Sequence, residues 1–185
     1  MKARIAILVL AAAAALTAAA IPSRAQEPTA AGLWQKLDDE TKKPITWFLF
    51  VDRAGVFEGH IVKIFHQAGD EQNPVCTRCT DDRKGAPVLG LSFVRGMKRA
   101  GLKYEDGTVL DPRDGKIYSA VMTLNPEKQT LTLRGYVLGI QWLGGNDTWH
   151  RLPDTAYKQL DPAILAKYAP ERAESKKGKA KSPPK

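Results

Sequence analysis

Apolar and polar positions alternate in short runs over most of the chain. From Gly32 to Leu152, apolar-rich runs of a few residues are separated by turn-forming Gly, Pro, Asn and Asp, and no helical periodicity is present. This pattern predicts an antiparallel all-β domain. The runs, which we count as eight strands, are 32–37, 45–51, 56–65, 88–94, 102–104 with 109–110, 117–124, 130–137 and 148–152.

The clearest hairpin joins 117–124 to 130–137 around a polar turn at 125–129. Its alternation predicts one inner face, made by Tyr118, Ala120, Met122, Leu124, Leu131, Leu133, Gly135 and Val137. A meander of this size closes into a barrel or folds over as a sandwich, and closure removes exposed strand edges. We therefore expect a small eight-stranded barrel, whose interior has room for side chains or for one small ligand.

The first and last strands contain the residues expected to close this barrel. Gly32-Leu33-Trp34 opens the first strand, and Trp149-His150-Arg151 lies in the last. If these strands are neighbours, Arg151 lies across the ring of Trp34, a cation–π contact worth about 0.5–2 kcal/mol. We expect this pair to act in barrel closure, so that Arg151→Ala lowers the melting temperature without changing ligand affinity.

The two ends of the chain differ from this β domain. Residues 1–25 have the basic start, apolar run and small-residue cleavage site of a signal peptide, with 20/21 as the second choice of cleavage site. The alternative, a membrane anchor, is disfavoured because the run from Ile5 to Ala20 is short of the roughly 20 residues of a span. After the barrel domain at 26–153, Asp161 and Pro162 predict a short helix within 154–170. The Lys- and Pro-rich residues 171–185 are expected to be a disordered tail.

The net charge of +8 is concentrated at these ends. The leader carries +3 and the tail, with six basic and two acidic residues, carries +4, which leaves +1 for residues 26–170. A nearly neutral folded domain does not fit a nucleic-acid-binding protein. The tail is therefore the part of the chain suited to an anionic envelope surface.

Cys76-Thr77-Arg78-Cys79 is the sharpest chemical motif, and four interpretations compete for it. Haem attachment requires His at position 80, which is Thr, and a thioredoxin-like redox pair requires a strand–helix setting that this polar loop lacks. Zinc would need two further ligands, for which His60 and His66 are the candidates. We predict a disulfide, favoured by export to an oxidising compartment and worth at most about 2 kcal/mol for so small a ring.

No catalytic constellation stands out elsewhere. The histidines at 60, 66 and 150 lack a recognisable Ser or Cys partner, and the carboxylate pairs Asp38-Asp39 and Asp81-Asp82 lie in polar loops where solvation explains them. We therefore expect a protein that is not an enzyme and that needs no metal or cofactor. Tyr104 and Tyr118 lie near turns, where barrel mouths form, and we expect these two residues and Tyr136 to border a ligand cup.

Several short motifs together resemble the bacterial secreted family known as domain of unknown function 2147. They are Gly32-x-Trp34, Phe57-Glu58-Gly59-His60-Ile61, Cys76-x-x-Cys79, Gly90-Leu91, Gly101, Asp111-Pro112-x-x-Gly115-Lys116-x-Tyr118, Leu131-x-Leu133-x-Gly135-Tyr136 and Trp149-x-Arg151. The resemblance implies a lipocalin-like barrel in the cell envelope with no established ligand or activity. The family has no assigned catalytic residues to carry over.

These observations lead to two functional hypotheses. The first is a periplasmic or secreted binding protein that holds a small apolar ligand in its barrel. The second is an envelope interaction module that acts through its outer surface and its basic tail, with no role for nucleic acid. Removal of the tail separates them, because only the second hypothesis predicts a loss of envelope association on truncation.

Overall fold

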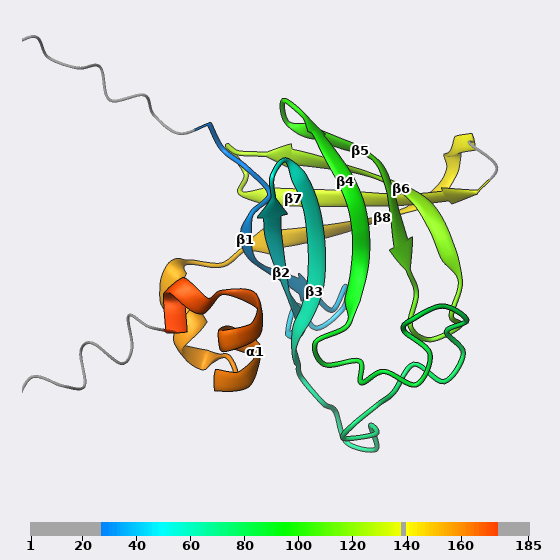
Figure 1. The fold of residues 1–185 in the computed structure, drawn as a ribbon, viewed down its shortest axis with the longest axis vertical. Helices are drawn as coiled ribbons and strands as arrows, with labels where there is room; N and C mark the ends of the chain where they lie inside the picture. The colour runs from blue at the N-terminus through cyan, green and yellow to red at the C-terminus, as the bar shows by residue number, and fades with distance from the viewer. Residues whose placement is uncertain (1–26, 138–139, 174–185) are drawn as a thin grey trace, which may run out of the picture.

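The computed structural model describes residues 27–137 and 140–173, so the expected signal peptide and most of the expected tail lie outside the described residues. The described chain forms one closed barrel of eight strands, in which each strand is antiparallel to its neighbours and β1 pairs with β8 (Figure 1). The predicted fold class is confirmed. The strands are β1 (Gly32–Leu37), β2 (Pro44–Arg53), β3 (Val56–Ile64), β4 (Ser92–Ala100), β5 (Lys103–Leu110), β6 (Ile117–Asn125), β7 (Thr130–Val137) and β8 (Ile140–Arg151).

Three strands differ from the sequence prediction. Residues 88–91 belong to the long β3–β4 connection, so β4 begins only at Ser92. The expected turn after Tyr104 is instead a bulge within β5, where Asp106 has a φ of 61° and the register with β6 shifts. The glycines expected to form the last turn lie inside β8, where Gly145 pairs with Gly135 of β7.

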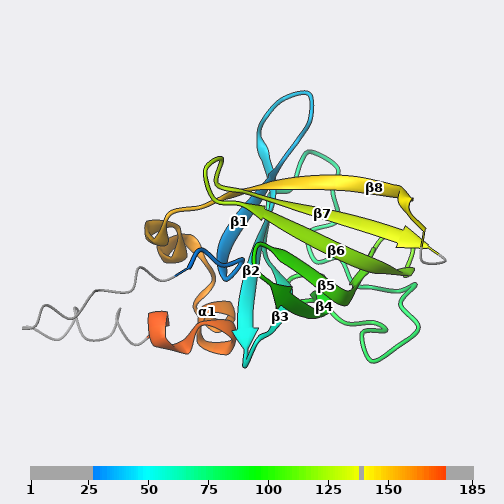
Figure 2. The same ribbon diagram turned by 90° about the horizontal axis from the view of Figure 1, so that it is seen from above.

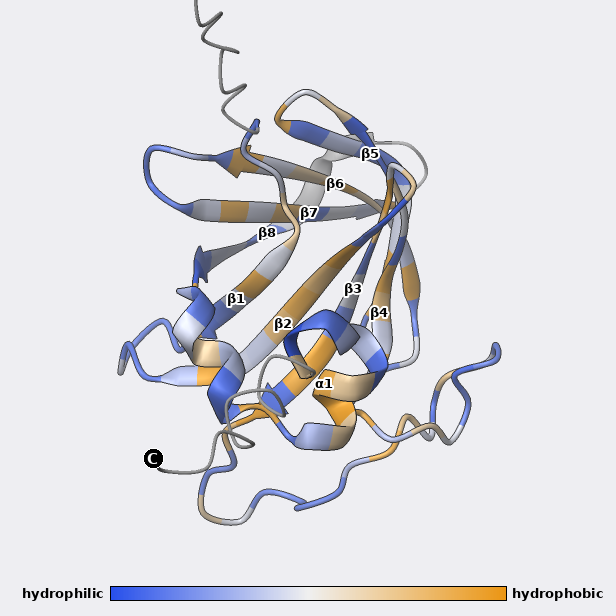
Figure 3. Ribbon diagram, turned by 60° about the vertical axis from the view of Figure 1, so that its left-hand side comes forward, coloured by the Kyte–Doolittle hydropathy of each residue, from blue (hydrophilic) through white to orange (hydrophobic). Residues whose placement is uncertain are grey.

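Over β1 to β3, apolar side chains cover both the inner and the outer face of the barrel wall. The interior cluster contains Trp34, Phe48 and Phe57, whereas Leu33, Trp47 and Leu49 belong to an outer cluster with residues of the C-terminal helices. Figure 3 shows α1 (Pro162–Tyr168) lying beside β2 and β3. Because successive side chains of a strand point to opposite faces, a strand covered on both sides reads as apolar at every position. This explains why residues 56–65 have apolar side chains at both odd and even positions in the sequence.

Two helical segments follow β8 on the outer side of β1 to β3 (Figure 2). The 3-10 helix η1 (Asp154–Gln159) was not predicted, whereas α1 (Pro162–Tyr168) begins as expected, with the side chain of Asp161 accepting a hydrogen bond from the Ala163 backbone N–H at 2.7 Å. Residues 170–173 continue in helical conformation, and the rest of the expected tail lies outside the described residues. Within the described residues, no helix has both the length and the apolar character needed to cross a membrane.

The N-terminal segment 27–31 closes one end of the barrel. The Ala30 backbone N–H donates a hydrogen bond to the Tyr104 hydroxyl at 2.7 Å, and the Trp34 indole N–H donates to the Ala30 carbonyl at 2.8 Å. The Arg151 guanidinium donates to the carbonyls of Ala31, at 2.9 Å, and of Thr29. These bonds hold the segment across the barrel, so this end is sealed.

Candidate functional site

Seven inward-facing residues form a half-buried ring at the other end of the barrel. Alternation along each strand assigns them to the interior, because they occupy the same face as the buried residues of the interior cluster. All seven are of intermediate exposure, and we call them the mouth layer: Lys36, Thr46, Ile64, Val109, Tyr118, Gly135 and Asp147. Ile64 and Val109 pack on the interior cluster from above.

The next inward-facing residues along the same strands are fully buried and form a floor. Phe48, Phe93 and Trp149 meet there, with the Trp149 ring centroid 4.6 Å from that of Phe48 and 5.8 Å from that of Phe93. Ala120 and Leu133 complete this floor under the β6–β7 side of the barrel. Exposure therefore changes sharply within two residues on each strand, and the mouth layer is the accessible part of the interior.

The three tyrosines expected to border a cup are not brought together. Tyr118 belongs to the mouth layer, and its hydroxyl donates to Asp114 at 3.5 Å. Tyr104 is 0% exposed and lies at the sealed end, where its ring packs edge-on against Phe57. Tyr136 follows the inward-facing Gly135 and is therefore on the outer face, opposite the exposed Ser119 of β6. The expected cup is corrected accordingly: of the three, only Tyr118 lines the mouth.

A charged pair lies inside the mouth at the seam between β1 and β8. The Lys36 ammonium is 2.6 Å from the Asp147 carboxylate, and their side chains are 35% and 31% exposed. The backbone pairing of β1 with β8 comprises only Trp34 with Arg151 and Gln35 with His150. Lys36 and Asp147 thus bridge the seam beyond the last paired residues. Charges at half-buried positions interact more strongly than surface charges, because solvent screens them less.

The β5–β6 connection adds further charges beside this pair. Asp111 binds the guanidinium of Arg113 through both carboxylate oxygens, at 2.6 Å for the closest contact, and this hydrogen bonding lowers the pKa of Asp111. The positive charge of Lys36 lowers the same pKa further. The mouth therefore has a charged rim over β1, β8 and the β5–β6 connection.

The disulfide loop of the β3–β4 connection packs against that same β5–β6 connection. Cys76 and Cys79 form the predicted disulfide, are almost fully buried, and belong to the interior cluster. Gly115, at a φ of 75°, fits directly against the Arg78 carbonyl, where a Cβ atom would overlap it. The CxxC motif and the Asp-Pro-x-x-Gly-Lys segment are therefore two sides of one contact, which explains why both are so distinctive in the sequence.

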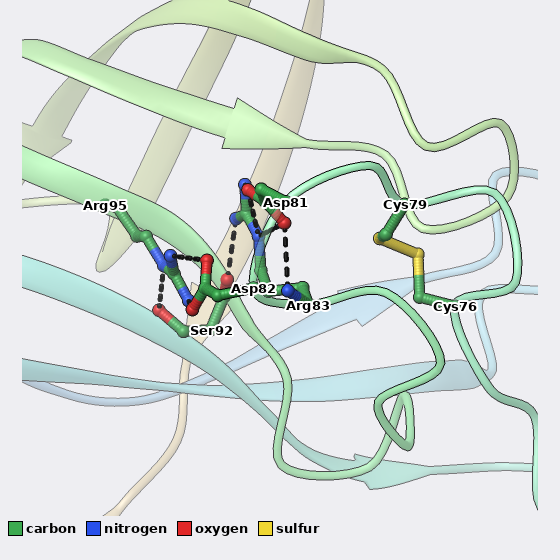
Figure 4. A network of polar contacts seen from close by, with 7 residues as sticks. All are labelled: Cys76, Cys79, Asp81, Asp82, Arg83, Ser92 and Arg95. Atoms are coloured by element: carbon green, nitrogen blue, oxygen red, sulfur yellow. Dashed lines mark hydrogen bonds and ion pairs between the residues drawn. A yellow bond between two sulfur atoms is a disulfide. The ribbon is translucent and has the colours of Figure 1, made fainter.

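Arginine–aspartate contacts fix the rest of this loop to β4 (Figure 4). Arg83 is only 4% exposed and donates to the Ser92 carbonyl at 2.9 Å and to both oxygens of Asp81. This hydrogen bonding lowers the pKa of Asp81 to about 2. Arg95 makes a bidentate pair with Asp82, at 2.7 and 2.9 Å. The Asp81-Asp82 pair thus holds the loop in position, whereas its polar surroundings in the sequence had suggested two solvated carboxylates.

The closure pair lies at the sealed end, remote from the mouth layer. Trp34 and Arg151 are direct cross-strand partners, and the guanidinium carbon lies 4.1 Å from the centre of the indole ring. The geometry is the one expected from the sequence. Its role in closure and its independence from ligand binding remain predictions.

The histidines do not assemble into a site. His60 is buried on the outer face of β3 and stacks on Tyr168 of the C-terminal region, with ring centroids 4.0 Å apart. His66 and His150 are exposed at separate places. Among residues 27–137 and 140–173, no group of three His, Cys, Asp or Glu side chains is arranged to hold a metal ion.

Sequence reasoning missed most of the mouth layer, although a signal was present. Lys36 is two residues after the buried Trp34, and Asp147 is two residues before the buried Trp149. A period of two therefore directs both charges into the barrel. Charged residues at inward-facing positions are unusual, and they are the signal in the sequence that could have identified this end of the barrel.

The comparisons with known proteins agree with this architecture. A family model described as "Uncharacterized protein conserved in bacteria (DUF2147)" matches residues 32–151. A solved structure described as "Protein HP1028 from the human pathogen Helicobacter pylori belongs to the lipocalin family" is similar, with a TM-score of 0.59 and 19% sequence identity over 71% of this chain and 89% of that chain. At that identity the likeness shows a shared fold. A search of curated proteins returned no match.

Proposed function

Because the chain belongs to the bacterial DUF2147 family and folds as a lipocalin-like barrel, we propose that it is a non-enzymatic binding protein that holds a small ligand in the mouth layer. The fold is consistent with a binding role, since barrels of this size enclose one small ligand in the open end. The ligand would enter between the charged rim and the disulfide loop. It would rest on the floor of Phe48 and Trp149.

The observation that carries the proposal is the exposure of the interior at one end only. Val109, Tyr118 and Gly135 are inward-facing neighbours on three adjacent strands, and each is partly exposed. The deeper residues of the same strands, such as Ala120 and Met122, are 0% exposed. The accessible space is therefore shallow, and we infer a ligand with a small apolar body in place of one that fills the whole barrel.

An exported location fits the same proposal. The Cys76–Cys79 disulfide is typical of an oxidising compartment, and the first 25 residues have the composition of a signal peptide. We therefore place the binding function in the periplasm or outside the cell. A scavenging or carrier role in that compartment requires only reversible binding.

Filling the mouth is expected to abolish binding. Gly135 has its missing Cβ position 3.3 Å from Val109 Cγ1 and 3.7 Å from Tyr118 Cβ, so a leucine there extends into the mouth. We expect the neutral fluorescent dye N-phenyl-1-naphthylamine to bind the natural protein, and Gly135→Leu to weaken its binding at least about tenfold. Fluorescence titration measures the dissociation constant, and a thermal melt checks that the variant is folded.

The neighbouring residue provides a matched control. Tyr136→Ala removes a large side chain from the outer face of the same strand, and we expect it to change dye affinity less than about twofold. Tyr118→Ala, which removes part of the mouth wall without adding bulk, is expected to weaken binding about fivefold. Equal affinities for the natural protein and both mouth variants would show that the dye binds elsewhere and would remove the support for the mouth layer as the site.

A further inference from the structure

We propose that the ligand of the mouth layer carries a carboxylate, bound by Lys36, and an apolar body directed toward β5 to β7. This inference rests on the proposed binding function and specifies the chemical class of its ligand. Its basis is the distribution of polar groups around the mouth layer. These groups are gathered on one side of the ring, over β1, β2 and β8.

The Lys36 ammonium has hydrogen-bonding capacity that its one partner does not use. An ammonium has three N–H donors, and the contact with Asp147 at 2.6 Å occupies one of them. Thr46, the cross-strand partner of Lys36, adds a hydroxyl on the neighbouring strand of the same layer. A half-buried ammonium gains from a further acceptor because burial reduces the water available to it.

Directly below this corner, the floor holds a second donor without a partner. Trp149 is 1% exposed, and its indole N–H has no hydrogen-bond partner. It faces inward on β8 two residues from Asp147, so the two side chains project into the barrel from the same strand. A buried donor without an acceptor is unfavourable by roughly 1–3 kcal/mol, and natural structures rarely leave one unless a ligand or water completes it.

The balance of donors over acceptors indicates an anionic ligand group and not a cationic one. Asp147 is occupied by Lys36, and Asp111 is occupied by both nitrogens of the Arg113 fork. The groups that still have capacity on this side, Lys36 and Trp149, are donors. A carboxylate supplies up to four acceptor sites on two oxygens, which suits the unused donors of the Lys36 ammonium.

The opposite side of the ring indicates the nature of the rest of the ligand. Val109 and the Tyr118 ring present apolar surface there, and both pack closely over Gly135, whose missing Cβ position is 3.3 Å from Val109 Cγ1. A molecule with its carboxylate at β1 and β8 would place its apolar body against this wall. The mouth layer therefore fits an acyl or aryl carboxylate of modest size.

The test compares two probes that differ only in charge. The fluorescent acid 2-naphthaleneacetic acid and its methyl ester share a small apolar body, and only the acid offers a carboxylate. We expect the natural full-length protein to bind the acid about tenfold more tightly than the ester. Lys36→Met, which keeps the length and removes the charge, is expected to erase this preference while leaving ester affinity within twofold.

Two further variants sharpen the comparison. Lys63→Met removes a charge that lies over the Trp47 ring on the outer face, 4.5 Å from its centre, and is expected to leave the preference intact. Asp147→Asn removes the competing carboxylate and is expected to raise acid affinity several-fold. Ester binding by each variant reports that the site is folded.

The outcomes distinguish a failure of the proposed binding function from a failure of the carboxylate assignment. If neither probe binds the natural protein, the proposed binding function fails. If both bind equally, or if Lys36→Met keeps the preference for the acid, the mouth binds ligands but the carboxylate assignment is overturned. The assignment is supported if the preference for the acid disappears in Lys36→Met and persists in Lys63→Met.

Discussion

Replacing Arg151 by alanine is expected to lower the free energy of unfolding by about 3–4 kcal/mol. The substitution removes a cation–π contact with Trp34, worth about 0.5–2 kcal/mol. It also removes the guanidinium donor from the carbonyls of Thr29 and Ala31, and hydrogen bonds from charged donors contribute about 1.5–3 kcal/mol each. The values overlap because one side chain makes all three contacts, so they do not simply add.

This prediction tests the sealing of the barrel by its N-terminal segment. Urea unfolding measures the change in free energy, and hydrogen exchange at the Ala30 N–H reports whether the segment has loosened. Arg53→Ala is the control, because Arg53 makes an exposed ion pair with Glu58 and its removal should change stability by less than about 1 kcal/mol. A loss no larger than that of the control would contradict the closure role of Arg151. The affinity of the mouth for N-phenyl-1-naphthylamine should stay unchanged in Arg151→Ala.

Acidification from pH 7.5 to pH 5 is expected to lower stability by roughly 2 kcal/mol through His60 alone. Burial lowers the pKa of His60 from its usual 6.5 to about 4, against the opposing effect of the Glu58 carboxylate 3.8 Å away. A histidine whose pKa is lower in the folded state favours unfolding when it is protonated. Its contribution is therefore complete above pH 6.5 and is lost as the pH falls toward 4, at about 1.4 kcal/mol for each unit of pKa difference.

The surroundings of His60 allow the loss of stability on acidification to be assigned to this residue. The ring is 3% exposed and stacks on Tyr168, and both of its nitrogens lack a hydrogen-bond partner. Besides Glu58, the charged groups that act on it are Arg53, Lys167 and Arg95, all of which oppose protonation. Measurement stops at pH 5, where the carboxylates of lowered pKa, such as Asp81 and Asp111, are still ionised.

His60→Phe keeps an aromatic ring against Tyr168 and removes the titrating group. From pH 7.5 to pH 5, we expect the free energy of unfolding of this variant, measured with urea, to fall by roughly 2 kcal/mol less than that of the natural protein. His66→Phe, at an exposed position, should retain the full dependence. An unchanged slope in His60→Phe would contradict the assignment of acid sensitivity to this contact between β3 and the C-terminal region.

Local patterns in the sequence predicted the parts of the fold that are decided locally. The hairpin at 117–137 alternates strictly, and Asp161 with Pro162 forms a helix start that needs no tertiary information. The pairing of Trp34 with Arg151 was also predictable, because closure of a meander makes the first and last strands neighbours. In each case the required information lies within a few residues or follows from the connectivity.

The site was less predictable because it depends on register across the whole barrel. Tyr104 precedes a bulge and lies at the sealed end, and aromatic character alone did not distinguish it from Tyr118. Tyr136 was expected at the mouth, although the alternation that directs Gly135 inward directs its neighbour outward. A one-residue change of register moves a side chain to the opposite face, so a ligand-lining set requires the structure.

The C-terminal helices show a second limit of sequence reasoning. Leu33, Trp47 and Leu49 are as apolar as the interior residues between which they alternate, and no local pattern assigns them to an outer cluster. Their partners, such as Leu160 and Leu165, follow more than a hundred residues later. Alternation alone cannot assign the faces of β1 to β3, because these strands are covered by apolar residues on both faces.

The most direct test of the mouth layer as a ligand site is a crystal structure with a brominated probe. After co-crystallisation with 6-bromo-2-naphthoic acid, anomalous scattering locates the bromine atom without reference to the protein side chains. We predict a bromine peak inside the barrel mouth, against Val109 and Tyr118. A peak confined to the outer groove between Leu49 and Tyr157, or no peak inside the barrel at a saturating concentration, would contradict the account.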